Sequence, residues 1–209
     1  MIDLHAVDRD IDALDESHQR LTDDLRAMTD VDPATPTALP GWTVGHVMTH
    51  IARNADSTIR MLAGLSQYWK GVESRGADIE LGASRPWDEL VDDVAITSEA
   101  VTRQIRDVTD WSGTVQATTA VRPKATLPQM RRREVEIHRV DLGMGYGFAD
   151  LPDDFVAFES RRLTMLWQAR QPMGLTALPD AVLTLPERER LAWLFGRRAL
   201  EGVEPAGVI

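Results

Sequence analysis

Two polar side chains stand four residues apart in the segment RREVEIHRVDLG, which covers residues 132–143. In a helix, Glu134 and His138 would project from one face, because residues four apart lie one above the other. Asp141, three residues further on, would lie near the same face. A carboxylate and an imidazole presented together can bind a metal ion. The same pair is also a common surface ion pair, worth about 0.2–0.5 kcal/mol.

A third metal ligand would have to come from another helix. The segment GWTVGHVMTHIARNADS predicts an amphipathic helix with Thr43 as its N-cap. A polar line runs beside its apolar face and consists of His46, His50, Asn54 and Ser57. Spacing alone leaves open whether His46 or His50 would complete the site. Two histidines and one glutamate suit Zn²⁺ with one open coordination position, which is the catalytic arrangement.

Composition limits the classes of function. The 209 residues have a formal net charge of -10 and include no cysteine. An acidic chain is a poor ligand for a polyanion, so we expect no nucleic-acid partner. Without cysteine, any thiol chemistry must use a thiol that arrives as a ligand. The charged N-terminus lacks the apolar region of a signal peptide, and no apolar run approaches 18 residues, so we expect a cytoplasmic protein with no membrane partner.

Hydrophobic periodicity predicts four long helices in the first 150 residues. In the first of them, apolar residues recur at spacings of three and four, and His18 is the one polar member of that stripe. The predicted helices cover residues 3–29, most of 41–65, about 86–109, and a segment from near Pro128 to the glycine-rich LGMGYG. We therefore expect a mainly α protein in which residues 1–150 form a four-helix bundle.

The segments between these helices differ in composition. Residues 63–85 contain several glycines and predict a loop or lid. Residues 110–124 are rich in threonine and irregular, with room for a short extended piece.

The pattern changes after residue 150. Residues 153–170 and 186–202 predict helices, the second with a proline-led, acidic start. The sequences GLTAL and AVLTL, separated by Pro179 and Asp180, predict a small hairpin. Residues 151–209 are therefore expected to form a small α/β subdomain.

Two segments carry a resemblance to a known family. GWTVGHVMTHIARNAD and MRRREVEIHRVDLGMGYGFADLP resemble the two signature segments of the mycothiol-dependent maleylpyruvate isomerases, which belong to the DinB-like metal-binding four-helix bundles. AWLFGRRALEG, near the C-terminus, is similar to a third. The resemblance implies three metal ligands: His50, Glu134 and His138. It thus favours His50 over His46, and it places the family's functional arginine at Arg197, with Arg198 as an adjacent rival.

Other polar residues are candidates for supporting roles. Those expected to support the ligands or to contact the substrate are His18, His46, Asn54 and Asp141. His18 falls where the family has a histidine in its first helix, although on its own it reads as a hydrogen-bonded core histidine. Asp141 would either orient His138, as a metal-bound histidine needs, or be a solvated charge at the helix end. Trp42 and Trp193 are expected to be packing residues.

The resemblance implies a zinc enzyme, with another divalent metal as the alternative, that uses mycothiol. A metal-bound thiol is a thiolate near neutral pH. It would add to the cis double bond of maleylpyruvate, and rotation followed by expulsion of the thiol would give fumarylpyruvate. The substrate is a dianion, so Arg197 is expected to bind a carboxylate. The expected partners are a small-molecule thiol and a small electrophile, and the chain is expected to be a monomer or small homo-oligomer.

Three alternatives share the same scaffold. The metal–thiol pair would also support a mycothiol S-transferase that acts on epoxides, halides or other electrophiles. A zinc-bound water without any thiol would make a hydrolase. A non-catalytic ligand-binding module would have no need of an intact His–Glu–His set. The lining of the electrophile pocket separates the first two activities, and we expect it in residues 63–85 and in the C-terminal part. By this resemblance, we expect that part to be shorter than the family's full α/β C-terminal domain.

Overall fold

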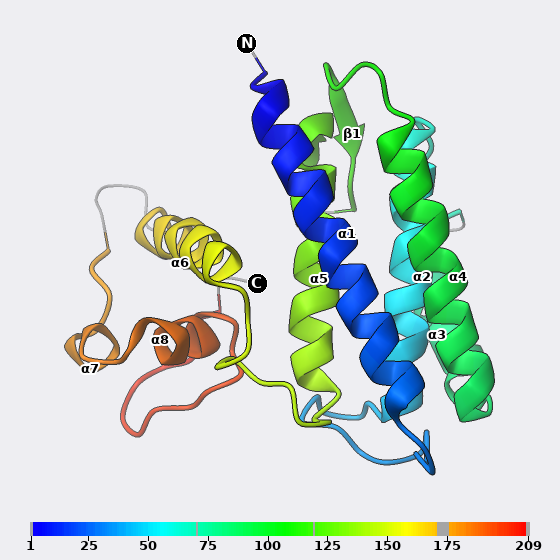
Figure 1. The fold of residues 1–209 in the computed structure, drawn as a ribbon. Coiled ribbons are helices and arrows are strands. Elements are labelled where there is room, and N and C mark those ends of the chain that lie inside the picture. The colour runs from blue at the N-terminus through cyan, green and yellow to red at the C-terminus, as the bar shows by residue number, and fades with distance from the viewer. Residues whose placement is uncertain (1, 70, 119, 171–175, 208–209) are drawn as a thin grey trace. The chain divides into compact units, whose positions relative to one another are not determined.

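The computed structural model describes residues 2–69, 71–118, 120–170 and 176–207. The chain divides into two compact units, Met1–Met144 and Gly145–Ile209. Helices dominate both units, which confirms the mainly α prediction (Figure 1). Within the described ranges, the only sheet has two strands.

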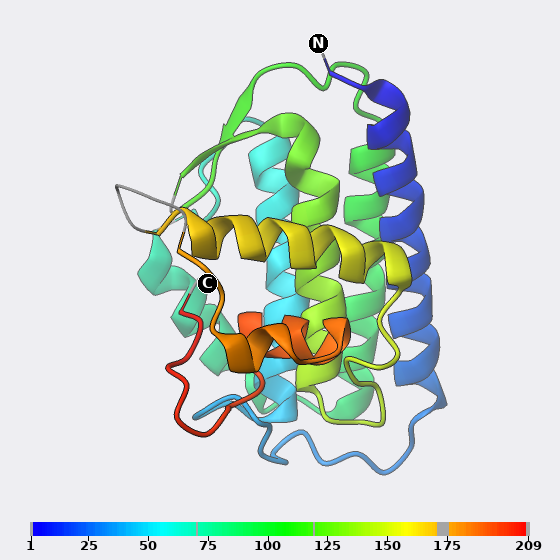
Figure 2. The ribbon, with the colours of Figure 1, turned by 90° about the vertical axis from the view of Figure 1, so that its left-hand side faces the viewer.

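The N-terminal unit is a four-helix bundle, as predicted. The four long helices are α1 (Leu4–Ala27), α2 (Val44–Leu62), α4 (Trp87–Arg106) and α5 (Leu127–Asp141). α5 packs against both α1 and α2, and α2 also packs against α4 (Figures 1 and 2). The apolar stripes predicted from the sequence meet in one core, in which Leu14, Ile51 and Leu90 are fully buried. This arrangement brings the polar line of α2 towards α5.

Local signals set where these helices begin. The Asp3 side chain accepts a hydrogen bond from the backbone N–H of Ala6, which caps α1. Thr43 is the N-cap of α2, as predicted, and its backbone N–H donates to His46 Nδ1 at 3.2 Å. Pro128 lies in the first turn of α5, where a missing N–H costs nothing.

The prediction of a loop over residues 63–85 is wrong, because this segment contains α3 (Val72–Ala83). α3 packs against α2 at very close range. A Cβ on Gly45 would lie 1.9 Å from the Ala83 carbonyl oxygen, and a Cβ on Gly82 would lie 2.5 Å from the Thr49 side chain. The glycines that lower helix propensity thus permit the tertiary contact that stabilises the helix.

The short extended piece predicted in residues 110–124 is confirmed. β1 (Thr114–Gln116) pairs antiparallel with β2 (Val121–Pro123), and a single 3₁₀ turn, Lys124–Thr126, leads into α5.

The C-terminal unit contains α6 (Asp153–Gln168), α7 (Asp180–Leu183) and α8 (Glu187–Leu194). The helix predicted at residues 153–170 is confirmed. α6 packs on α8, where the rings of Trp167 and Trp193 lie 4.9 Å apart, so Trp193 is a packing residue as expected.

Two expectations for this unit are wrong. The segment AVLTL, residues 181–185, belongs largely to α7 and is not a strand, because the backbone N–H groups of Val182 and Leu183 bond to the Pro179 carbonyl oxygen. Part of its predicted partner, GLTAL, lies outside the described residues. The helix predicted up to residue 202 ends at Leu194, because Gly196 adopts a φ of 70°.

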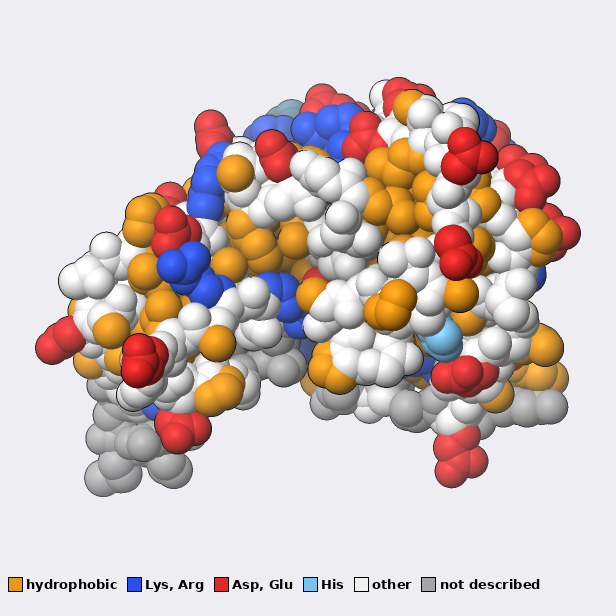
Figure 3. Space-filling model, turned by 90° about the horizontal axis from the view of Figure 1, so that it is seen from below, with side chains coloured by type: hydrophobic (Ala, Val, Ile, Leu, Met, Phe, Trp, Pro, Cys, Tyr) orange, Lys and Arg blue, Asp and Glu red, His pale blue; other side chains and the backbone are white. Residues whose placement is uncertain are grey.

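The surface agrees with the acidic composition. At the end of the bundle that carries the connection from α1 to α2, carboxylates are scattered among apolar and uncharged side chains (Figure 3). Among the described residues, no helix combines the length and the apolar character that crossing a bilayer requires.

Candidate metal centre

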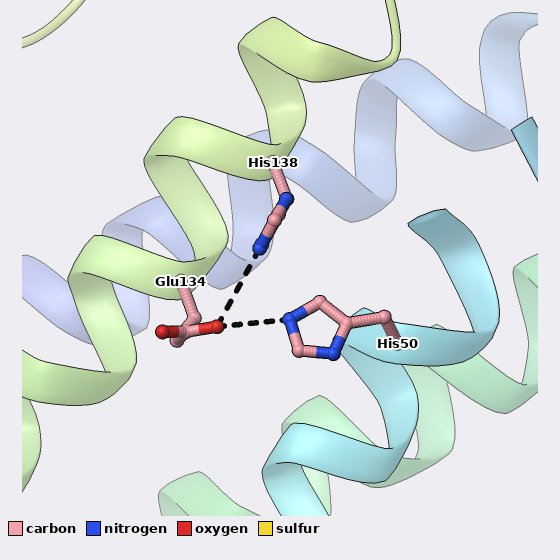
Figure 4. A group of neighbouring side chains, drawn as sticks. All are labelled: His50, Glu134 and His138. Carbon is pink, nitrogen blue, oxygen red and sulfur yellow. Dashed lines mark hydrogen bonds and ion pairs between the residues drawn. The ribbon is translucent and has the colours of Figure 1, made fainter. Parts of the chain in front are cut away.

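Three side chains from α2 and α5 converge inside the N-terminal unit (Figure 4). His50 Nε2 lies 2.9 Å from Glu134 Oε2, and His138 Nε2 lies 3.6 Å from the same oxygen. One ligand atom from each residue falls within 4.8 Å of the other two. Ligands bound to a tetrahedral zinc ion at about 2.0–2.1 Å are about 3.3–3.4 Å apart, so the observed spacing fits one ion.

The charge states of the three groups also suit a metal. Burial lowers the pKa of His50 to about 4, against the opposing effect of Glu134, so its imidazole is neutral at pH 7. Burial raises the pKa of Glu134, but hydrogen bonds with His138 and His50 outweigh it and hold the pKa well below its usual value. Burial lowers the pKa of His138, but the carboxylates of Asp141 and Glu134 raise it overall. Metal binding competes with protons for such ligands, so an ionised Glu134 and an uncharged His50 favour it.

Asp141 contacts the ring nitrogen of His138 that faces away from Glu134. Its Oδ2 lies 2.9 Å from His138 Nδ1, and the side chain is buried. A carboxylate at this position holds the ring proton on Nδ1, which leaves Nε2 free to point at the centre. The alternative of a solvated charge does not fit a buried Asp141.

Arg131 lies one turn before Glu134, and sequence reasoning missed it. Its side chain is 1% exposed. Its Nη1 donates to the Ile51 carbonyl oxygen at 2.8 Å and to Asn54 Oδ1 at 3.0 Å. Both partners follow His50 on α2. Arg131 therefore links α2, which carries His50, to α5, which carries Glu134 and His138. The available signal was the spacing of three between Arg131 and Glu134, which places them on one helix face.

His18 belongs to the same buried network. Its Nε2 accepts a hydrogen bond from Arg131 Nε at 3.2 Å, and its Nδ1 lies 2.9 Å from Thr102 Oγ1. Burial, and then the charge of Arg131, hold the pKa of His18 well below its usual value, so the ring is neutral. His18 therefore contacts the support of the ligands, as a hydrogen-bonded core histidine.

Two further aromatic rings, those of Trp42 and His46, lie at the N-terminal end of α2. His46 caps the helix through Nδ1, and its Nε2 lies 3.5 Å from Glu80 Oε2. Trp42 is half-buried, and its ring lies 5.4 Å from that of His50 and 6.3 Å from that of His138. Trp42 packs, as expected, but it packs on two of the converging side chains.

The two candidate arginines lie in the C-terminal unit. Arg197 follows α8 and is exposed, and its Nη1 donates to the Phe195 carbonyl oxygen at 2.9 Å. Arg198 Nη2 lies 3.0 Å from Glu189 Oε2. The assignment of Arg197 to the substrate stays a prediction.

Comparison with known proteins points to one family. The sequence profile of the Mycothiol maleylpyruvate isomerase N-terminal domain matches residues 14–143, which include the three converging side chains. A crystal structure of a mycothiol-dependent maleylpyruvate isomerase is similar, with a TM-score of 0.80 and 21% identity over 95% of this chain and 93% of that one. The crystal structure of a histidine-to-alanine variant of such an enzyme is also similar, with a TM-score of 0.81 and 20% identity over 95% of this chain and 93% of that one. Among curated proteins, no sequence matches this chain.

Proposed function

This chain belongs to the mycothiol maleylpyruvate isomerase family of enzymes, and we propose that it is a zinc-dependent enzyme that uses mycothiol to convert maleylpyruvate to fumarylpyruvate. The observation that carries the proposal is the convergence of two imidazole nitrogens on one oxygen of Glu134. A ligand-binding module would not need this set of groups.

In this proposal, His50 Nε2, Glu134 and His138 Nε2 hold one divalent ion. Two imidazoles and one carboxylate leave one position of a tetrahedral zinc ion open. When bound, the metal supplies a position at which the sulfur of mycothiol is held as a thiolate near neutral pH. The chain has no cysteine of its own, which agrees with the use of an external thiol.

The surrounding residues would keep these groups in place. Asp141 would hold the proton of His138 on Nδ1, and Arg131 would hold α5 in register with α2. Trp42 would cover the rings of the two histidines and limit the access of water. We propose that Arg197 binds one carboxylate of the dianionic substrate.

The first test is the metal content of the purified protein, measured by mass spectrometry. We expect about one zinc per chain in the wild type and a loss of zinc in Glu134→Ala. Glu99→Ala is the matched control, because Glu99 is an exposed carboxylate on α4. A wild-type protein that binds no metal, even after zinc is added, would contradict the proposal.

The second test is turnover of maleylpyruvate with and without mycothiol, followed by chromatography of the product. We expect fumarylpyruvate only when both zinc and mycothiol are present. Conjugation of mycothiol to epoxides or halides without isomerisation of maleylpyruvate would identify an S-transferase. Hydrolysis that is independent of thiol would identify a metal-dependent hydrolase.

A further inference from the structure

A cavity of about 500 Å³ lies beside the candidate metal centre, against α2 and α3. Its wall includes Thr49, the neighbour of His50, and four arginines: Arg53, Arg60, Arg75 and Arg85. Guanidinium groups bind carboxylates and phosphates, so the cavity is a candidate site for an anionic ligand. An arginine is available to such a ligand only if no carboxylate of the protein already pairs with it.

Two of the four arginines are neutralised by carboxylates of the same wall. Arg53 lies 2.6 Å from Asp93 and 2.9 Å from Asp56. Arg85 lies 2.8 Å from the other oxygen of Asp93. These pairs hold α2, the end of α3 and α4 together, and they leave little charge for a ligand.

Arg75, on α3, has only uncharged partners among the residues that the structure describes. Its Nη2 lies 3.1 Å from His50 Nδ1, and its guanidinium carbon lies 5.8 Å from the centre of the Trp42 ring. It also hydrogen bonds with the phenol of Tyr68, which lowers the pKa of that phenol against the larger, opposite effect of burial. A half-buried guanidinium without a carboxylate partner is suited to bind an anion.

The backbone fixes where Arg75 stands. α3 approaches α2 so closely that neither Gly45 nor Gly82 has space for a Cβ. Arg75 lies in the first turn of α3 and reaches the ring of His50 from this closely docked helix. We propose that Arg75 is a specificity-determining residue that binds a carboxylate of the electrophile in this cavity. The inference rests on the proposed function, in which the electrophile is a dianion, and it adds a second arginine to Arg197.

The contact with His50 links this anion site to the metal. A neutral imidazole has one N–H donor and one acceptor nitrogen. While His50 Nδ1 accepts from Arg75, Nε2 carries the proton and donates to Glu134 Oε2 at 2.9 Å. If a metal ion were held by Nε2, the ring proton would lie on Nδ1, and Nδ1 could no longer accept from Arg75. The Nη2 group of Arg75 would then be available to an anion in the cavity.

Calorimetric titration with maleate, a cis dicarboxylate, tests the inference without turnover. The proteins are the zinc-loaded wild type, Arg75→Gln, Arg75→Lys and Arg103→Gln, with no thiol present. Arg103 is the matched control, because it is an exposed arginine of α4 that pairs with Glu99 and does not line this cavity. We expect Arg75→Gln to bind maleate about 10- to 100-fold more weakly, Arg75→Lys to be intermediate, and Arg103→Gln to match the wild type.

Three results would overturn the inference: no maleate binding to the wild type, unchanged binding to Arg75→Gln, or an equal loss in Arg103→Gln. Zinc content and thermal unfolding of each variant show that the loss is not caused by misfolding. With maleylpyruvate, Arg75→Gln should raise KM by more than it lowers kcat. If the proposed function is wrong but this inference is right, maleate binding will still depend on Arg75, although the enzyme does not isomerise maleylpyruvate.

Discussion

Glu134 and Glu136 stand two residues apart on α5, and they serve different purposes because they meet different partners. Glu136 is fully buried, and its Oε1 accepts from Ser17 Oγ at 2.6 Å and from Arg20 Nη2 at 3.2 Å. Glu134 faces the imidazoles of α2 and α5, and its side chain is one-third exposed. The charge of Glu136 is balanced by the fold, whereas Glu134 meets a neutral His50 and can accept a cation from outside. The two carboxylates thus differ both in their exposure and in the charge of their neighbours.

The largest expected effect concerns the stability of the two sides of α5. Glu136→Ala should lower the free energy of unfolding by about 2–3 kcal/mol, because it removes a fully buried carboxylate that accepts hydrogen bonds from Ser17 and Arg20 on α1. Glu134→Ala should change the stability of the metal-free protein by at most about 1 kcal/mol, because this carboxylate is one-third exposed. Urea denaturation in the presence of a chelator measures both. Equal losses in the two variants would show that Glu134 is as structural as Glu136.

A smaller effect should sharpen the assignment of Glu134 to metal binding. Asp141→Asn removes the carboxylate that orients His138, so zinc affinity should fall about 10- to 100-fold. Asp12→Asn, on the exposed face of α1, should keep the wild-type affinity. Competition with a zinc-binding dye gives the two affinities, and an unchanged value in Asp141→Asn would remove Asp141 from the support of the centre.

The smallest expected effect is a pH dependence that comes from His18. The pKa of the ring lies near 6.5 in the unfolded chain and well below that in the fold. Below pH 6.5 the unfolded chain therefore binds a proton that the folded chain does not. Stability is complete above pH 6.5 and falls by up to about 1.4 kcal/mol per pH unit below it.

His18→Gln should remove this contribution, although the same-signed contribution of His50 remains down to about pH 4. Chelator-treated wild type and variant, unfolded in urea at pH 7, 6 and 5, give the two slopes. Identical slopes would mean that His18 is not the neutral, buried group described above.

The elements that the sequence predicted well are those whose signal is local. Apolar spacing identified α1, α2, α4 and α5, and the spacing of four between Glu134 and His138 identified two of the three side chains that converge in the structure. The segment AVLTL misled because its β-branched and apolar residues also suit a short buried helix, and Pro179 starts that helix.

The residues that were missed depend on partners far away in the chain. Arg131 bonds to groups 77 to 113 residues distant, and Arg75 approaches a histidine 25 residues before it. α3 was missed for the same reason, since its stability comes from docking on α2 at Gly45. No periodicity within one segment encodes such pairings.

The buried charges of α5 also bear on the order in which the chain folds. This helix buries Arg131, Arg132, Glu136, Arg139 and Asp141, so hydrophobic collapse alone cannot hold it in place. Ser17, its partner on α1, is 119 residues from Glu136. We expect α5 to dock after the other helices have assembled, which pulsed hydrogen exchange during refolding would show as late protection of its amides. A partly folded chain, in which α5 has not yet docked, would then lack the assembled site. Metal binding would be restricted to molecules that have completed folding.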